Sequence, residues 1–365
     1  MKEQEFIPKS YTFAPQKGSV TSKSPSNIAL VKYWGKHGEQ LPENTSISFT
    51  LQNCHTTTSL YFEEKQEAAF QFEVYLDGQR EPSFEPKITT FFERIEAYVP
   101  FLRKYQFKIE TVNSFPHSSG IASSASGMSA LAVCLILFER QFKDKQLNTL
   151  HEVLTPFEVK KASFLARLGS GSAARSIEGP LVVWGKHSKI AGSSDRFGIK
   201  YPNTVHDNFN NYRDTILLVD KGEKQVSSTV GHNLMHGHPY AKQRFAEANK
   251  NIERLMGIFE SGDISEFIKL VESEALQLHA MMMSSMPYFI LMKPNTLEII
   301  NKIWNFRRNT NIPVCFTLDA GANVHVLYPD SVQEEVSAFI ETELAPFCKN
   351  GEFIHDVVGL GVTIQ

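Results

Sequence analysis

The pattern of apolar and polar residues predicts strands and helices mixed along the whole chain. In the first half, β-branched and aromatic runs between turn-like breaks predict strands over residues 47–51, 57–62, 70–76 and 181–184. After Ser126, apolar residues recur at three- and four-residue intervals, which predicts a helix. A second helix should follow Thr155, because Pro156 suits its first position and Glu158 completes a capping box. We expect this helix to end at Gly169.

The second half repeats the mixture. Strands are expected over residues 215–219, 314–318, 324–328 and 357–364, and helices over 245–259, 264–282, 297–307 and 332–344. Between the halves, residues 186–213 are polar and contain Gly, Ser, Pro and Asn, so we place a domain boundary near their end. The expected domains are residues 1–212 and 213–365. Strands packed under helices, with hairpin pairing, predict an α+β fold rather than a doubly wound sheet.

Composition adds to this picture. With 365 residues, 42% of them hydrophobic, the chain is too long for one ordinary core and too apolar to be disordered. The formal net charge is −3, so no overall positive field would attract nucleic acid or an anionic membrane. We therefore expect neither as a partner, and any bound anion must be held by a local cluster of donors.

The cysteines and the N-terminus indicate a compartment. The four cysteines are far apart and form no CxxC motif, which argues against a disulfide framework or structural zinc and fits a reducing environment. The first residues, MKEQEFIPKS, lack the apolar run of a secretory signal, and the longest apolar stretch is too short to span a bilayer. We expect a cytoplasmic location.

Residues 116–127, with the sequence PHSSGIASSASG, form the strongest candidate for chemistry. This small, hydroxyl-rich segment opens directly into a predicted helix. A phosphate needs free N–H groups, close backbone approach and the positive end of a helix dipole, and the hydroxyls add possible Mg²⁺ ligands. The alternative is a serine-capped helix after a loose turn. Because the sequence contains neither GxxxxGK[ST] nor GxGxxG, an ATP site here would belong to neither a P-loop protein nor a Rossmann protein.

Three charged residues stand in unusual contexts. Arg175 ends a second glycine- and serine-rich stretch, where it could clamp an anion, or where a helix cap is followed by a solvated arginine. Lys32 interrupts an apolar strand and must find an anion, unless it extends to water from a sheet edge. Asp319 lies between two predicted strands, either as an ordinary turn residue or as a base aimed into a cleft. Together with the two loops, they form a coherent set for phosphoryl transfer to a hydroxyl.

Other polar and sulfur-containing clusters have simpler interpretations. His232, His236 and His238 lack an acidic or cysteine partner at metal-ligand spacing, so a solvated loop is favoured over a metal site. Met281, Met282, Met283 and Met286 are interpreted as core filler. His279 is interpreted as a packed helix histidine rather than a catalyst.

The stretches NIALVKYWGK, LPENTSISFTL, FPHSSGIASSASG, ARLGSGSAARSIEGPLVVW, VSSTVG, LQLHAMMM, FTLDAGANV and HDVVGLGVTIQ occur in this order along the chain. In them the chain resembles the GHMP small-molecule kinase superfamily and, within it, the family of mevalonate diphosphate decarboxylases. The resemblance implies a ribosomal-protein-S5-domain-2-like N-terminal domain, a ferredoxin-like C-terminal domain and an active site in the cleft between them. It also implies phosphorylation of the 3-hydroxyl of mevalonate 5-diphosphate by ATP with Mg²⁺. Loss of phosphate and CO₂ would then give isopentenyl diphosphate.

The same resemblance implies roles for individual residues. Asp319 would accept or orient the hydroxyl proton, Lys32 would lie near it and the transferred phosphate, and Arg175 would hold the substrate carboxylate. The implied substrate-binding residues are Tyr33, Lys36, Ser170, Ser172 and Ser228, together with Arg175. The implied ATP-binding residues are Ser118, Gly120, Ala122, Ser123, Ser124 and Ser126, with Ser124 the first choice for a Mg²⁺ contact. Relatives are usually homodimers, so a homodimer is expected.

Two departures from the family pattern keep other activities open. Ser118, Ser119 and Ile121 stand where alanine-rich, leucine-containing versions are usual, and Thr229 stands where some bacterial relatives carry a diphosphate-holding arginine. The alternatives are a phosphomevalonate decarboxylase or a mevalonate 3-kinase. The full set of Asp, Lys and Arg favours complete decarboxylation. A more remote alternative is a non-catalytic binding protein with the GHMP fold, which an intact Asp319 and an intact ATP loop argue against.

Overall fold

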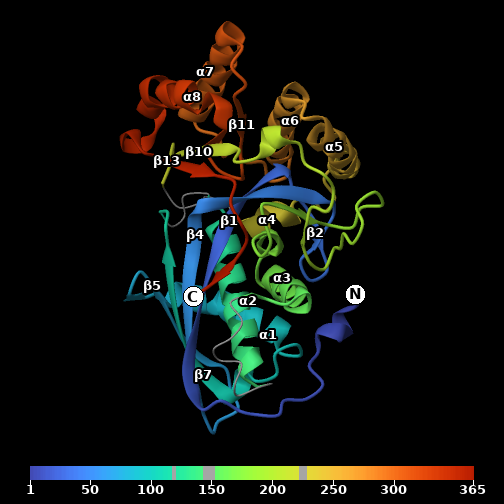
Figure 1. Ribbon diagram of the computed structural model, residues 1–365, viewed down its shortest axis with the longest axis vertical. Coiled ribbons are helices and arrows are strands. Elements are labelled where there is room, and N and C mark those ends of the chain that lie inside the picture. The colour runs from blue at the N-terminus through green and yellow to red at the C-terminus, as the bar shows by residue number, and fades with distance from the viewer. Residues whose placement is uncertain (117–120, 143–152, 222–227) are drawn as a thin grey trace.

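The computed structural model describes residues 1–116, 121–142, 153–221 and 228–365, except the side chains of residues 228 and 229. Two sheets, each with its own helices, follow one another along the long axis of the molecule (Figure 1). Short 3₁₀ turns occur at Glu3–Phe6, Pro82–Phe84, Leu102–Lys104, Gly171–Arg175, Asp207–Phe209, Asp330–Val332, Ala345–Phe347 and Lys349–Gly351.

The larger sheet is built on two long antiparallel strands, β1 (Lys17–Val31) and β4 (Ser46–Glu64). Its strand order is β14-β1-β4-β7-β5-β6, and β8 and β9 extend it from β4. The remaining strands are β5 (Gln71–Leu76), β6 (Gln79–Arg80), β7 (Tyr105–Asn113), β8 (Leu181–Trp184), β9 (Ile199–Lys200) and β14 (Thr363–Ile364). A separate two-stranded ribbon of β2 (Lys36–His37) and β3 (Leu41–Pro42) follows β1.

Three helices build the core beside this sheet. α2 (Ser123–Gln141) packs against β1 and β4, α3 (Pro156–Gly169) packs against α2, and α1 (Glu85–Ile95) packs against α3. The core is rich in aromatic rings; Phe62 of β4 and Phe138 of α2, for example, stack with their centroids 3.9 Å apart. This packing directs the N-terminus of α2 toward the second sheet (Figure 1).

The smaller sheet has the order β11-β12-β10-β13 and is antiparallel throughout. Its strands are β10 (Arg213–Leu217), β11 (Cys315–Thr317), β12 (Val324–Tyr328) and β13 (Phe353–Val357). The helices of this half are α4 (Ser228–Asn233), α5 (Ala241–Ser261), α6 (Ile264–Met283), α7 (Pro294–Thr310) and α8 (Gln333–Phe339), which continues as a π-helical segment, Ile340–Leu344. Within the part of the chain that the structure describes, no helix is both long and apolar enough to cross a membrane.

Most predicted elements are confirmed, and several are corrected. Thr155 and Glu158 form the predicted capping box, and α3 ends at Gly169. The strands predicted over 47–51 and 57–62 are one continuous strand, β4, and β1 ends at Val31, so Lys32 follows the strand instead of interrupting it. The last predicted strand, 357–364, is wrong, because β13 ends at Val357 and Thr363–Ile364 joins the other sheet. The apolar and polar pattern did not predict α1, β7 or most of β1.

The C-terminal segment ties the two halves together. Val358 forms an isolated bridge with Leu51, and β14 pairs with β1 in the larger sheet. The buried carboxylate of Asp356 accepts hydrogen bonds from the backbone N–H groups of residues 52–54 at 2.7–2.9 Å. The domain boundary between residues 212 and 213 stays a prediction. β14 follows this boundary in the sequence but pairs with β1, which precedes it.

Candidate active site

A cavity of about 610 Å³ lies where the two halves meet. Its walls come from β1 and the residues after it, from α1, α4 and α6, from the N-terminus of α2, from the segment after α3, and from the turn between β11 and β12. Among the described residues, five cationic side chains line it against one carboxylate, that of Asp319; the cations are Lys32, Lys36, Lys87, Arg94 and Arg175. This surplus of positive charge suits a ligand that carries several negative charges.

Lys32 and Asp319 meet in this cavity from different sheets. The Lys32 Nζ lies 3.3 Å from Asp319 Oδ1, and the lysine is 1% exposed. Burial lowers the pKa of Lys32, and the neighbouring Asp319 opposes that shift. The prediction that this lysine must find an anion is therefore confirmed, and the solvent-exposed alternative is excluded.

Two buried groups position this pair from α6. His279 donates from Nε2 to the backbone carbonyl of Asp319 at 3.1 Å, and burial lowers its pKa to about 4. The imidazole is therefore neutral near pH 7, in keeping with its interpretation as a packed histidine. Glu274, which is completely buried, accepts a 2.9 Å hydrogen bond from the backbone N–H of Lys32. The same carboxylate is held by Arg244 and by the Asn251 amide.

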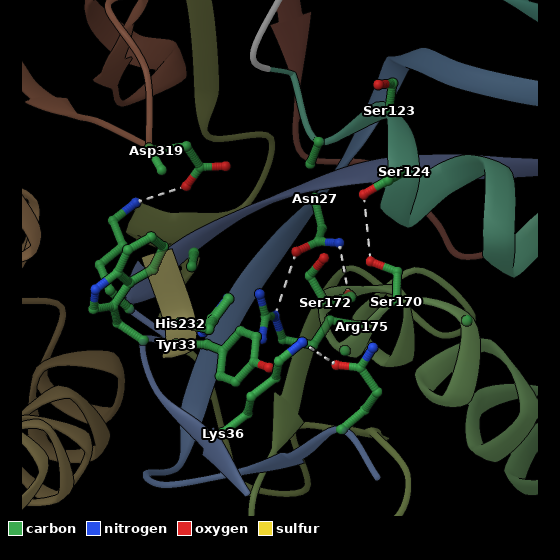
Figure 2. Close-up of a pocket in the computed structure, with 18 of the residues that line it drawn as sticks. Asn27, Tyr33, Lys36, Ser123, Ser124, Ser170, Ser172, Arg175, His232 and Asp319 are labelled. Carbon is green, nitrogen blue, oxygen red and sulfur yellow. Dashed lines mark hydrogen bonds and ion pairs between the residues drawn. The ribbon is translucent and has the colours of Figure 1, made fainter. Parts of the chain in front are cut away.

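Arg175 occupies a polar cradle beneath the cavity. Its Nε donates to Ser48 Oγ at 2.6 Å, and its Nη1 donates to Ser46 Oγ at 2.7 Å. A weaker bond runs from Nε to Asn27 Oδ1 (Figure 2). Burial lowers the pKa of the guanidinium to about 10, so it remains cationic at neutral pH. Among the described residues, no carboxylate forms an ion pair with it. A buried guanidinium with only neutral partners would be stabilised by an anion, and Arg175 lines the cavity where such an anion could bind.

The two glycine- and serine-rich segments converge on one side of the cavity. Ser124 Oγ lies 3.3 Å from Ser170 Oγ, and Ala122, Ser123 and Ser172 line the same space (Figure 2). The N-terminus of α2 therefore opens into the cavity, as phosphate binding requires.

Four of the expected site residues do not contribute described side chains to the cavity. Ser126 does not line the cavity, because its buried hydroxyl bonds to Thr56 Oγ1 in the core. Ser118 and Gly120 lie outside the described residues, as does the side chain of Ser228. The roles expected for these positions stay predictions.

Tyr33 and Lys36 line the opposite wall. The Tyr33 ring packs edge-on against Trp184 and beside His232, with centroids 4.7 and 4.3 Å apart. Lys36 donates to Gln40 at 2.9 Å, and burial together with Arg94 lowers its pKa. Both side chains line the same cavity as Arg175.

The interpretation of the remaining clusters needs correction. His232 and His238 are not in a solvated loop: both are buried, and only His236 is exposed. Met281 and Met282 are core residues as expected, but Met283 and Met286 are exposed. No group of three His, Cys, Asp or Glu residues arranged to hold a metal is found among the described residues.

Several residues that support the site were not predicted from the sequence. Ser46 and Ser48 alternate along a strand, so they share one face, and that spacing was a readable signal for a polar cradle. Asn27 lies within the stretch around Lys32 but was not singled out. Glu274 had no such signal, because a glutamate on an amphipathic helix looks like a surface residue.

The oxygen atoms that line the cavity suit a Mg²⁺ ion that is bound mainly by the phosphates of a ligand. Mg²⁺ takes oxygen atoms and is commonly bound by one or two protein groups together with substrate phosphates and water. The hydroxyls of Ser123 and Ser124 and the carboxylate of Asp319 line the same cavity. These residues fit such a shared site, although no all-protein cage is present among the described residues.

Comparison with known proteins identifies the class and then the family. The arrangement of the two halves is that of the GHMP kinase fold, so the α+β prediction is confirmed. Residues 24–196 match a family model for the diphosphomevalonate decarboxylase-like N-terminal domain, and residues 215–358 match one for the mevalonate 5-diphosphate decarboxylase C-terminal domain. The chain belongs to the diphosphomevalonate decarboxylase family, as the resemblance implied.

Individual relatives agree with this assignment. Diphosphomevalonate decarboxylase of Rattus norvegicus is 26% identical over 360 residues, covering 93% of this chain and 84% of the relative. Mevalonate diphosphate decarboxylase from Staphylococcus aureus superposes with a TM-score of 0.79 at 26% identity, covering 96% of this chain and 98% of that one. A further structure, MDDEF in complex with MVAPP, AMPPCP and magnesium, gives a TM-score of 0.80 at 27% identity, covering 96% and 99%.

Proposed function

We propose that this protein catalyses the ATP-dependent decarboxylation of mevalonate 5-diphosphate to isopentenyl diphosphate. The observation that carries the proposal is the convergence of Asp319, Lys32 and Arg175 on one cavity, with the carboxylate paired to Lys32 and no ion pair of the guanidinium among the residues that the structure describes. This combination supplies a proton acceptor, a cation near the transferred phosphate and a receptor for a carboxylate. The family to which the chain belongs supports the same reaction.

Asp319 would take the proton of the substrate's 3-hydroxyl. At the same time the hydroxyl oxygen would attack the terminal phosphorus of ATP, and ADP would leave. A tertiary alcohol is a very weak acid, so an aspartate cannot remove the proton fully in advance. Proton removal should therefore accompany P–O bond formation. The Lys32 Nζ lies 3.3 Å from the carboxylate and would orient it toward the cavity.

Arg175 would orient the carboxylate that is lost. When the C3–O bond breaks and phosphate leaves, positive character builds at C3, and the C1–C2 bond breaks to release CO₂ and form the double bond. Pairing that is too tight would oppose this loss, because it would stabilise the bound carboxylate more than the transition state. The three neutral partners of Arg175, namely Asn27, Ser46 and Ser48, fix its direction while leaving its charge for the substrate.

The N-terminus of α2 and the adjoining serines would bind ATP. Ser123 and Ser124 offer hydroxyls beside the positive end of a helix. Mg²⁺, when bound, would neutralise phosphate charge, with Ser124 as the proposed protein contact. Tyr33, Lys36, Ser170 and Ser172 would bind mevalonate 5-diphosphate together with Arg175, and Ser228 remains a proposed contact.

A substrate comparison tests the proposal. The purified protein should release CO₂ and ADP with mevalonate 5-diphosphate, and much less with mevalonate 5-phosphate or mevalonate. CO₂ release chiefly from the monophosphate would make it a phosphomevalonate decarboxylase, and ADP without CO₂ would make it a 3-kinase. Failure to consume ATP with any of the three compounds would favour a non-catalytic binding protein.

Two broader expectations belong to this proposal. A cytoplasmic location is supported by the four cysteines, all of which are buried and unpaired. A homodimer is inferred from the resemblance alone, and light scattering of the purified protein would test it.

A further inference from the structure

His232 of α4 forms part of the cavity wall. Its ring packs against two aromatic rings: its centroid lies 4.3 Å from that of Tyr33 (Figure 2) and 4.6 Å from that of Trp34. The residue is 7% exposed and lines the cavity together with Lys36 and Arg175. The mechanism proposed above assigns it no task.

The hydrogen bonding of His232 defines its tautomer. The backbone N–H of Gly35 donates to Nδ1 at 2.9 Å, so Nδ1 carries no proton. Burial lowers the pKa of the imidazole to about 3, and the nearby charges of Lys36 and Arg175 act in the same direction. The ring is therefore neutral near pH 7, and its single proton resides on Nε2.

The Nε2–H group has no hydrogen-bond partner among the described residues. This nitrogen is not fully enclosed by the protein, in contrast to Trp34 Nε1 and Tyr212 Oη, which are buried and have no partner. Since His232 lines the cavity, its free donor opens onto the cavity. A largely buried donor without an acceptor is costly, and an oxygen atom of a bound ligand would remove that cost.

We propose that the Nε2–H group of His232 donates a hydrogen bond to a phosphate oxygen of the substrate's diphosphate. This inference rests on the proposed function. The phosphate end is favoured because His232 stacks on Tyr33 and lies close to Lys36, the residues proposed to bind the diphosphate. A neutral donor suits this wall, because another cation would be repelled by Lys36 and Arg175 in the empty site.

Two substitutions separate the donor from the rest of the side chain. His232→Asn places an amide oxygen near the position of Nδ1, where it still accepts from Gly35, but leaves no donor at the position of Nε2. His232→Phe keeps the stacking on Tyr33 and Trp34 and removes both nitrogens. The matched control is His236→Asn, at an exposed position on the segment that follows α4.

Steady-state kinetics and competition by inorganic pyrophosphate provide the test. Both His232 variants should raise the KM for mevalonate 5-diphosphate and the inhibition constant of pyrophosphate at least about tenfold, the range expected for a hydrogen bond to a charged group. The KM for ATP should stay within about twofold, as should every constant of the control. Wild-type constants in His232→Asn, or a raised substrate KM with unchanged pyrophosphate inhibition, would overturn the inference. A wild-type protein that binds pyrophosphate but never releases CO₂ would instead refute the proposed function alone.

Discussion

Lys32 Nζ and Asp319 Oδ1 lie 3.3 Å apart although 287 positions separate the two residues in the sequence. The pair is asymmetric, because the lysine side chain is 2% exposed whereas that of Asp319 is 29% exposed and faces the cavity. The cation is thus fixed by its surroundings, and the carboxylate remains accessible to a ligand. Such an arrangement suits a base that must approach a substrate hydroxyl while its charge is stabilised from behind.

Replacing Asp319 by Asn should nearly abolish turnover. The amide cannot accept a proton, and loss of a general base typically costs about 10²- to 10⁴-fold in rate. ATP affinity should stay close to that of the wild type, because the phosphate-binding serines and the α2 N-terminus are unchanged. Single-turnover ADP formation and ATP binding by calorimetry measure the two effects, and unchanged turnover would remove Asp319 from the mechanism.

Replacing Arg175 by Ala should damage catalysis more than folding. Its removal takes away the cation proposed for the substrate carboxylate, for which we expect a loss in kcat of about 10²-fold or more. The partners left behind are Ser46, Ser48 and Asn27, which cavity water can satisfy.

A second buried arginine offers the matched control for Arg175. Arg167 of α3 bonds to backbone carbonyls of Glu39 and Arg196 and does not line the cavity. Arg167→Ala should lower the thermal midpoint with little change in kcat at a temperature where it is folded. If Arg175→Ala instead loses mainly stability, the arginine is structural and the proposed role is wrong.

The sequence predicted local elements well where the cause was local. The capping box of Thr155 and Glu158 depends on residues three apart, and it is present as expected. The predicted break in β4 failed for a distant reason. Residues 52–54 are polar and look like a turn, but the Asp356 carboxylate bonds to their backbone N–H groups, and the strand continues. No pattern within residues 47–62 contains that information.

The candidate site was predictable only in part for a similar reason. Lys32 attracted attention because a lysine among apolar residues needs an anion, and the structure supplies Asp319. The partner itself came from family resemblance, since spacing says nothing about which distant carboxylate arrives. His279 was expected to be packed, but neither it nor Glu274 was recognised as a support of the pair, because α6 contacts strands of both sheets and helical spacing does not show which distant residues it meets.

Glu274→Gln should reduce both stability and turnover. The substitution leaves the Arg244 guanidinium buried without its anion, which typically costs about 3–5 kcal/mol of unfolding free energy. It also weakens the acceptor that holds the backbone of Lys32, so the Lys32–Asp319 geometry should loosen and kcat should fall. Urea denaturation and steady-state assays at a temperature where the variant is folded measure the two effects.

The buried pair of Glu139 and Lys161 provides a comparison for Glu274. These residues lie 2.7 Å apart between α2 and α3, both side chains are 2% exposed, and neither lines the cavity. Glu139→Gln should therefore lose a similar amount of stability without loss of kcat. Equal effects of the two substitutions on kcat would show that Glu274 acts through stability alone.

Acid should remove a contribution of His279 to stability. Burial lowers its pKa from 6.5 to about 4, so between these values the unfolded chain binds a proton that the folded histidine excludes. The contribution is therefore complete above pH 6.5 and is lost as the pH falls toward 4, by on the order of 3 kcal/mol. A glutamine in place of the histidine would not titrate but could still donate to the Asp319 carbonyl, so His279→Gln isolates this effect. The difference in unfolding free energy between wild type and His279→Gln should shift against the wild type between pH 7.5 and pH 4.5. Urea denaturation across this range measures it, and a difference independent of pH would show that the histidine is not held neutral by burial.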